Sequence, residues 1–120
     1  MKILGYIFVI LVGLTTVAYL YIFKWQTIDT LTPPEFTYCG SQIWGSNPKY
    51  VEITQWLKNN KDDWDRSYAS YVPGVEYRTG SYQINVLSNT VVVSYKTDYG
   101  FPQFVKQINH GLEISCNGQP

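Results

Sequence analysis

The reactive side chains of this sequence do not form a known catalytic motif. His110 is the only histidine, and a general base needs a nucleophile or an orienting carboxylate beside it. No serine stands in a GxSxG pattern, and the sequence contains neither a glycine-rich phosphate loop nor HExxH. We therefore interpret His110 as a surface residue near the C-terminal end of a helix. We assign no catalytic residue and expect no enzymatic activity.

Asp62, Asp63 and Asp65 form a short acidic cluster that could suggest a cation site. An EF-hand loop that began at Asp63 would require glycine at its sixth position and glutamate at its twelfth. Tyr68 and Gly74 occupy those positions. We therefore interpret the cluster as a solvated turn, and the sequence predicts no metal ion and no other cofactor.

The two cysteines, Cys39 and Cys116, lie at the two ends of the region expected to form the folded domain. In an oxidising compartment they would close a loop of nearly the whole domain, which stabilises the fold by roughly 4 kcal/mol in the chain-entropy model. Neither cysteine has a second Cys or His at zinc-ligand spacing. We expect a disulfide between them. The alternative is two unrelated buried thiols, because free cysteine buries readily.

Aromatic residues make up 17% of the chain, and several fall in expected turns where the core does not need them. Rings in loops can be hot spots of protein contacts or platforms for sugars. The alternative is that several of them cap the ends of a small core. The second candidate surface is the polar face of the expected sheet, with Glu76, Arg78, Gln83 and Asn85. The candidate binding residues are Trp44, Tyr68, Tyr71, Tyr99 and Phe101.

All of these side chains follow an apolar segment, residues 3–23, that carries no charge. A helix of that length, at about 1.5 Å per residue, spans roughly 30 Å, the thickness of a bilayer's hydrocarbon core. We therefore expect residues 1–25 to form a retained membrane anchor. The alternative is a cleaved signal that ends near residues 16–18, but the apolar segment continues beyond the length that a signal requires.

Positive charge favours the N-terminal flank of the apolar segment. Lys2 and the chain's own amine precede it, whereas Lys24 on the other side is followed by Asp29 and Glu35. By the positive-inside rule, the N-terminus would lie in the cytoplasm. We therefore expect a single-pass protein of the inner (plasma) membrane, with a C-terminal domain that is periplasmic or extracellular.

After the anchor we expect a linker at residues 26–37 and one extracytoplasmic domain at residues 38–120. Pro33-Pro34 restricts the linker to an extended path. Within the domain, residues 68–72 and 112–116 could each form a short strand.

Two helices are expected in the domain. Asn47-Pro48 is a helix start signal with Asn47 as the cap, and this helix should end near Lys61. Residues 102–111 are expected to form the second helix, with a strand as the alternative. The apolar spacing that indicates these helices is that of Tyr50, Ile53 and Leu57 in the first, and of Phe101, Val105, Ile108 and Leu112 in the second.

Residues 75–96 predict an antiparallel β-meander. Gly80-Ser81 can be the centre of a type II′ turn, and Ser88-Asn89 can form a second two-residue turn. Both turns place the same side chains on one face, and that agreement specifies the register. The expected pairs are Val75 with Val86, Tyr77 with Ile84, Thr79 with Tyr82, Val86 with Val91, Ile84 with Val93, and Tyr82 with Tyr95. All of these residues except Thr79 form the expected buried face, and Val92 is the apolar exception on the other face.

The expected fold is therefore α+β. An N-terminal transmembrane helix precedes a small domain, in which an antiparallel meander of three to four strands carries two helices packed on one face.

Charge and size limit the function. The formal net charge is zero, with 9 basic and 9 acidic residues, which argues against nucleic-acid binding because that requires a basic surface. The small domain, the tether and the expected disulfide fit a membrane-tethered module that holds one protein partner, such as an inhibitor or an immunity-type protein. The alternative is an accessory or structural subunit of an envelope membrane complex, in which the anchor itself makes the contact.

Overall fold

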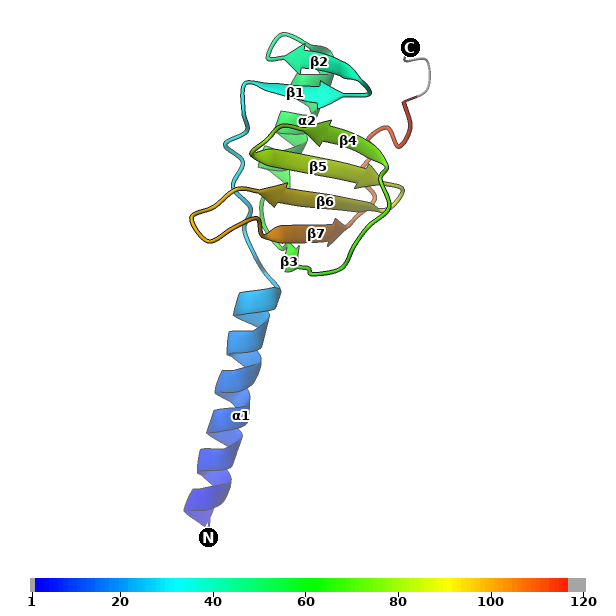
Figure 1. Cartoon of the computed structure of the whole chain (residues 1–120). Helices are drawn as coiled ribbons and strands as arrows, with labels where there is room; N and C mark the ends of the chain where they lie inside the picture. Colours follow the sequence, from blue (N-terminus) through cyan, green and yellow to red (C-terminus); the bar gives the residue numbers. More distant parts are fainter. Residues whose placement is uncertain (1, 117–120) are drawn as a thin grey trace.

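The computed structural model describes residues 2–116 and consists of one long helix joined to a sheet domain (Figure 1). Helix α1, Lys2–Phe23, projects from the domain, and most of the apolar side chains from Ile3 to Tyr19 are strongly exposed. In the described chain it is the one helix long and apolar enough to cross a membrane, with a mean hydropathy of 2.3 over Lys2–Leu20. The chain therefore begins with an apolar helix of the kind found in membrane anchors and in signals.

The domain is built on a seven-stranded antiparallel sheet in the order β2-β1-β4-β5-β6-β7-β3. Helix α2, Pro48–Asn59, lies on one face of this sheet (Figure 1). The mixed α+β class is confirmed, but the expected number of three to four strands is wrong. The strands are β1 Glu35–Tyr38, β2 Ser41–Trp44, β3 Asp65–Arg66, β4 Val75–Arg78, β5 Tyr82–Leu87, β6 Thr90–Tyr95 and β7 Gln103–Gln107.

The meander formed by β4, β5 and β6 has the expected register. Val75 pairs with Val86 and Tyr77 with Ile84, and the expected pairs between β5 and β6 are all present. The turn between β4 and β5 is not type II′, however, because Gly80 lacks the positive φ that this turn requires. The Thr79 hydroxyl instead accepts the amides of Ser81 at 3.2 Å and Tyr82 at 3.0 Å. Seven of the eight side chains expected on the inner face are buried, and Tyr95 is partly buried.

Helix α2 begins where its start signal predicted. The Asn47 side chain accepts the Lys49 amide at 2.8 Å, and Pro48 is the first helical residue. The helix ends at Asn59, close to the expected end near Lys61. Ile53 and Leu57 are both 0% exposed, since they face the inner side of the sheet.

The helix expected at residues 102–111 is wrong, and β7 takes its place. Phe104 is 5% exposed and pairs with Val93 of β6, while Val105 pairs with Val92 on the opposite face. All three valines of β6 are buried, so β6 is a central strand that needs a hydrogen-bonding partner on each side. In residues 2–116, α2 is therefore the one helix that packs on the sheet.

Two ranges that could each have formed a short strand, residues 68–72 and 112–116, belong to no strand. Strand β3, Asp65–Arg66, lies just before the first range and pairs with β7. A β1–β2 hairpin that was not expected adds the other edge of the sheet. Cys39, with φ 49°, and Gly40, with φ 81°, form its turn.

Residues 26–37, expected to form a linker, pack along the domain between α1 and the end of β1 (Figure 1). Gln26 and Trp64 exchange two backbone hydrogen bonds of 2.9 Å, and the Ile28 amide donates to the Lys61 carbonyl at 2.9 Å. The Ile28 side chain is 3% exposed and belongs to the core. Burial of this apolar side chain and the paired backbone explain why the segment is docked, since the two prolines restrict only its local path.

Tyrosine hydroxyls hold the rest of this segment. The Tyr82 hydroxyl donates to the Asp29 carbonyl at 2.6 Å, and the Tyr50 hydroxyl donates to the Pro33 carbonyl at 2.6 Å. The Asp29 amide donates to the Tyr95 hydroxyl at 3.2 Å. Burial raises the pKa of Tyr82, so its hydroxyl stays protonated and remains a donor. We call residues 24–33 the docked segment.

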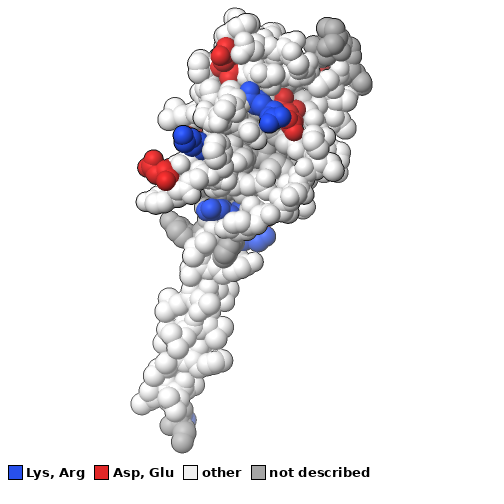
Figure 2. Space-filling view, viewed as in Figure 1, with Lys and Arg blue, Asp and Glu red and all other residues white. Residues whose placement is uncertain are grey.

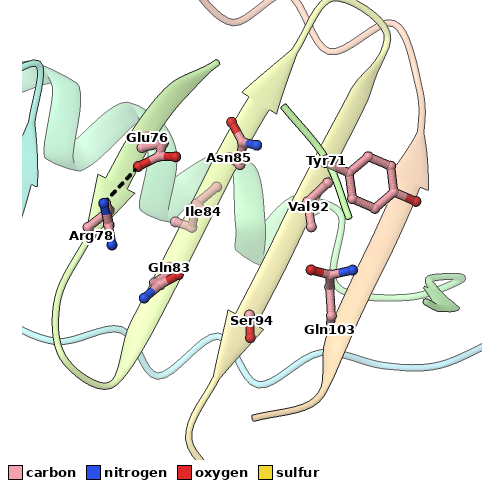
Figure 3. A pocket seen from close by; sticks show the side chains of 9 residues that line it. All are labelled: Tyr71, Glu76, Arg78, Gln83, Ile84, Asn85, Val92, Ser94 and Gln103. Carbon is pink, nitrogen blue, oxygen red and sulfur yellow. Dashed lines mark ion pairs between the residues drawn. The ribbon is translucent and has the colours of Figure 1, made fainter. Parts of the chain in front are cut away.

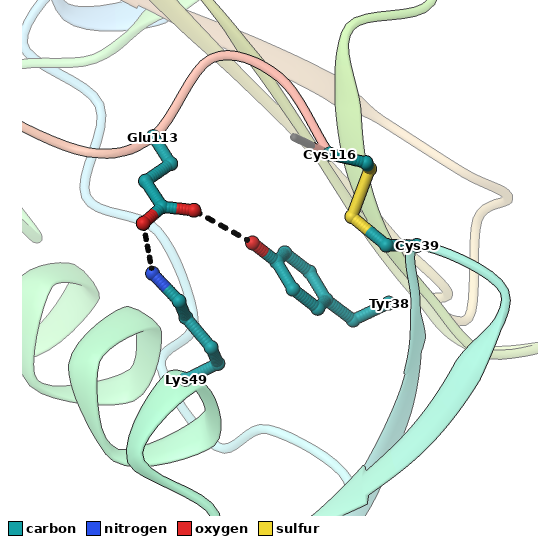
Figure 4. Close-up of a disulfide and its surroundings, with 5 residues drawn as sticks. All are labelled: Tyr38, Cys39, Lys49, Glu113 and Cys116. Atoms are coloured by element: carbon teal, nitrogen blue, oxygen red, sulfur yellow. Dashed lines mark hydrogen bonds and ion pairs between the residues drawn. A yellow bond between two sulfur atoms is a disulfide. The ribbon is translucent and has the colours of Figure 1, made fainter. Parts of the chain in front are cut away.

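Cys39 and Cys116 form the expected disulfide, which ties the β1–β2 turn to the C-terminal segment across a sequence separation of 77 (Figure 4). Beside it, Glu113 accepts the Lys49 ammonium of α2 at 2.9 Å and the Tyr38 hydroxyl at 3.5 Å. The C-terminal segment is thus connected covalently to the β1–β2 turn and electrostatically to α2.

Candidate functional site

The face of the sheet opposite α2 carries a segment that crosses it, residues 67–74, which we call the strap. The Gln103 side chain donates to the Ala69 carbonyl at 2.7 Å. The Asn85 side chain donates to the Val72 carbonyl at 3.0 Å and accepts the Gly74 amide at 2.7 Å. Polar side chains of β5 and β7 therefore hold the strap over the sheet by its backbone.

One pocket lies between the strap and the polar face of the sheet (Figure 3). We call it the polar pocket; its volume is about 160 Å³. Tyr71 enters it from the strap, beside Val92, which helps explain why Val92 is only 6% exposed on the polar face. Glu76 and Arg78 form an ion pair of 3.3 Å at the other side of the pocket. The lining residues are Tyr71, Glu76, Arg78, Gln83, Ile84, Asn85, Val92, Ser94 and Gln103.

A second, more open pocket adjoins the first through Gln103, which lines both. We call it the aromatic pocket; its volume is about 380 Å³. Its rings are strongly exposed: Tyr99 is 100% exposed, Tyr68 is 79% and Phe101 is 52%. The lining residues are Arg66, Ser67, Tyr68, Ala69, Ser70, Tyr99, Phe101, Pro102 and Gln103.

Arg66 supplies the charge of the aromatic pocket. Its guanidinium carbon lies 5.8 Å from the ring centre of Tyr68 and 5.9 Å from that of Phe104. Its Nε is buried without a hydrogen-bond partner, and no described carboxylate pairs with it. A guanidinium without a paired carboxylate could bind a carboxylate or carbonyl that a ligand brings to its accessible nitrogens.

The structure brings most of the predicted site residues together. Tyr68, Tyr99 and Phe101 line the aromatic pocket, and Tyr71 lines the polar pocket. The polar residues expected as a second surface, Glu76, Arg78, Gln83 and Asn85, all line the polar pocket as well. Trp44 is not part of either pocket, because it lies on β2 at the opposite edge of the sheet.

Sequence reasoning missed Arg66 and Gln103. Gln103 was placed in an expected helix, which hid its position on the polar face. Arg66 carried a usable signal, because Arg66 and Arg78 are the only two arginines in the sequence. Arginine is enriched in protein contact surfaces, and each of the two arginines lines one of the two pockets.

The other reactive side chains serve the fold. His110 Nδ1 accepts the Leu112 amide at 2.9 Å, and Nε2 donates to the Leu87 carbonyl. His110 follows a strand rather than ending a helix, so that part of its interpretation is wrong. In the acidic cluster, Asp62 accepts the Thr27 hydroxyl at 2.9 Å. Within residues 2–116, no group of three His, Cys, Asp or Glu side chains could hold a metal ion.

Charge on the face of the two pockets is sparse and of both signs (Figure 2). This view shows no extended patch of charge of one sign. Exposed rings, two guanidinium groups and amide side chains instead offer stacking, apolar contact and hydrogen bonds.

Comparison with known proteins leaves the function to be argued from this geometry. No protein-family model matches the sequence. No curated protein and no solved structure matches it significantly either.

Proposed function

We propose that this chain is a membrane-tethered, extracytoplasmic module that binds one protein partner through the polar and aromatic pockets. The observation that carries this proposal is the gathering of four candidate rings and both arginines around two adjoining pockets on one face. Tyrosine and arginine are among the residues that contribute most to protein–protein affinity. An inhibitor or immunity-type role fits such a module, because it requires a contact surface and no reaction.

The tether and its placement are part of the same proposal. Helix α1 has the length and hydropathy of a single membrane span, and the balance of flanking charge favours a cytoplasmic N-terminus. The disulfide between Cys39 and Cys116 fits an oxidising compartment. The domain would then lie on the periplasmic or extracellular side of the inner (plasma) membrane.

A second candidate function is that of an accessory or structural subunit of an envelope membrane complex. The docked segment favours it, because the hydrogen bonds of residues 26–33 hold the chain that directly follows α1 against the domain. An anchor that is joined in this way can take part in an assembly directly, whereas a flexible tether only limits the distance to the partner.

Site-directed photo-cross-linking of the full chain in its native membrane tests the binding proposal. A photoreactive phenylalanine analogue replaces Tyr99 or Phe101 at the aromatic pocket. In the matched controls it replaces Val51 or Gln55, both exposed on α2 on the other side of the sheet. We expect one dominant protein adduct from the pocket positions and none from the controls.

The Arg66→Ala substitution sharpens the experiment. It should lower the adduct yield about tenfold or more, because truncation of a hot-spot residue at an interface costs about 2 kcal/mol or more. The control is Lys58→Ala, at an exposed position of α2. Equal adducts from the pocket and from α2, or no protein adduct from either pocket position, would refute the proposed site.

A further inference from the structure

We propose that the partner is an integral protein of the same membrane, contacted at the aromatic pocket through its segment at the membrane surface. This inference rests on the proposed function and specifies the class of its partner. It follows from three features: the docked segment, the position of the aromatic pocket and the state of Arg66.

The docked segment removes the freedom of a tether. Directly after α1, Lys24 pairs with Asp65 at 3.2 Å. The next residues continue the attachment through the Gln26–Trp64 backbone pair and the buried side chain of Ile28. Trp25, with φ 55°, makes the turn from the helix into this attachment. The domain is therefore held at one short height above the end of α1.

The aromatic pocket lies at the end of the domain nearest α1. Asp65, which pairs with Lys24, is followed directly by Arg66, which lines the pocket. Strand β3 and the beginning of the strap form the part of the domain closest to α1, whereas β2 lies farthest from it (Figure 1). The headgroup layer outside the hydrocarbon core is roughly 5–8 Å thick on each side. The pocket would therefore open at or just above the headgroups.

This height selects the partner. A soluble globular protein would have to press against the headgroups to reach the pocket, and it would lose hydration there without compensating contacts. A membrane-embedded neighbour already presents the first residues after its own span at this height. Its backbone carbonyls or carboxylates could bind the Arg66 guanidinium, which pairs with no carboxylate among the described residues. Tyr99 and Phe101 would contact its apolar side chains.

The exposed rings at this end fit the same position. Trp25 is 59% exposed at the end of α1, and Tyr68 is 79% exposed on the strap. Aromatic side chains with a polar tip favour the interface between membrane and water. They would keep the pocket at the membrane surface, where it faces sideways toward a neighbouring protein.

Raising the domain tests this inference. A Gly-Ser spacer of about ten residues between Trp25 and Gln26 has a root-mean-square length of about 17 Å and leaves the attachments of residues 26–33 intact. With the photoreactive group at Phe101, the adduct yield should fall about tenfold or more. The Lys24→Ala variant is the control, because it removes the Lys24–Asp65 pair without changing the height. An oxidised Cys39–Cys116 pair reports that each variant is folded.

The outcomes separate this inference from the proposed function. Two results together support both proposals. The partner, in membranes that have not been cross-linked, stays in the membrane after an alkaline carbonate wash, and the adduct yield falls when the domain is raised. A partner that the wash releases, or an unchanged yield with the spacer, overturns this inference and leaves the binding module standing. If the photoreactive group in place of Phe101 cross-links only to phospholipid, or gives no adduct at all, both this inference and the proposed function are overturned.

Discussion

Gly74 is required by the close approach of the strap to β5. A Cβ at this position would lie 2.3 Å from the Val86 carbonyl oxygen, a backbone atom that cannot move away without disturbing the sheet. A Cβ at Gly80, in the next turn along the chain, would meet no atom within 4 Å. The two glycines therefore differ in what a single added methyl group would contact.

We expect Gly74→Ala to destabilise the fold by about 1–3 kcal/mol, because the strap must shift away from the sheet. Gly80→Ala should change the free energy of unfolding by no more than about 0.5 kcal/mol. Urea denaturation of the full chain in detergent, followed by tryptophan fluorescence, measures both. Equal effects of the two substitutions would show that the strap does not approach β5 this closely.

Glu113 should make stability depend on pH. The Lys49 ammonium holds the pKa of Glu113 below the ordinary value of a glutamate. The hydrogen bond with Glu113 in turn raises the pKa of Lys49 above the ordinary value of a lysine. A carboxyl group whose pKa is lowered by folding contributes stability at pH values above its ordinary pKa. That stability is lost as the pH falls through the lower pKa of the folded state. The raised lysine pKa contributes stability that is lost as the pH rises through the raised value. The pair should therefore act from about pH 5 to about pH 10.

Glu113→Gln keeps the size of the side chain and removes its charge. It should lower Tm at pH 7, and the difference from the unaltered chain should disappear as the solution is acidified below the folded pKa of Glu113. Thermal unfolding measured across this pH range gives the result. A difference that persists unchanged in acid would mean that the charge of Glu113 is not its cause.

At the scale of elements, the sequence predicted best where two independent signals agreed. In β4, β5 and β6, the alternation of apolar residues and the two-residue turn lengths both specify one register, and that register is present. Helix α2 likewise had a cap, a proline and an apolar stripe that point to the same start. The type of the Gly80 turn was missed because the Thr79 side chain, rather than a positive φ, closes it.

The missed elements depend on contacts that are distant in sequence. Val105 and Ile108 have helical spacing, but the open edge of β6 and its buried Val92 require a neighbouring strand. Strand β3 has two residues, too few to produce a pattern. Four residues of the strap line the pockets in addition to Tyr71. The position of the strap, however, depends on hydrogen bonds from the side chains of Asn85 and Gln103. The rings of the site could be chosen from the sequence, but their grouping could not.

The docked segment gives a prediction about an element that resembled a linker. Ile28→Ala should destabilise the domain by about 2–5 kcal/mol, because Ile28 is 3% exposed in the core. Leu31→Ala in the same segment should change stability by no more than about 0.5 kcal/mol, because Leu31 is 87% exposed. Urea denaturation of the full chain compares them. If the two substitutions have equal effects, residues 26–37 behave as a free linker.

At the scale of the whole molecule, one covalent bond joins the two ends of the domain. The Cys39–Cys116 bridge closes a sequence separation of 77, which corresponds to about 4 kcal/mol in the chain-entropy model. We expect Cys39→Ser with Cys116→Ser to lower the free energy of unfolding by about that amount. Reducing agent should destabilise the unaltered chain and leave the double variant unchanged. A loss below about 1 kcal/mol would mean that the bridge constrains the unfolded chain little.

The attachment of residues 24–33 also changes how this protein would meet another. If α1 spans a bilayer as proposed, a domain held this close to the anchor moves in the plane of the membrane and rotates chiefly about the membrane normal. The domain and its partner then meet by diffusion over an area instead of through a volume. Their relative orientation depends chiefly on the angle of rotation about the membrane normal. Much of the orientational entropy that association normally costs has already been lost during folding. A contact too weak to persist between two freely diffusing proteins can therefore persist here.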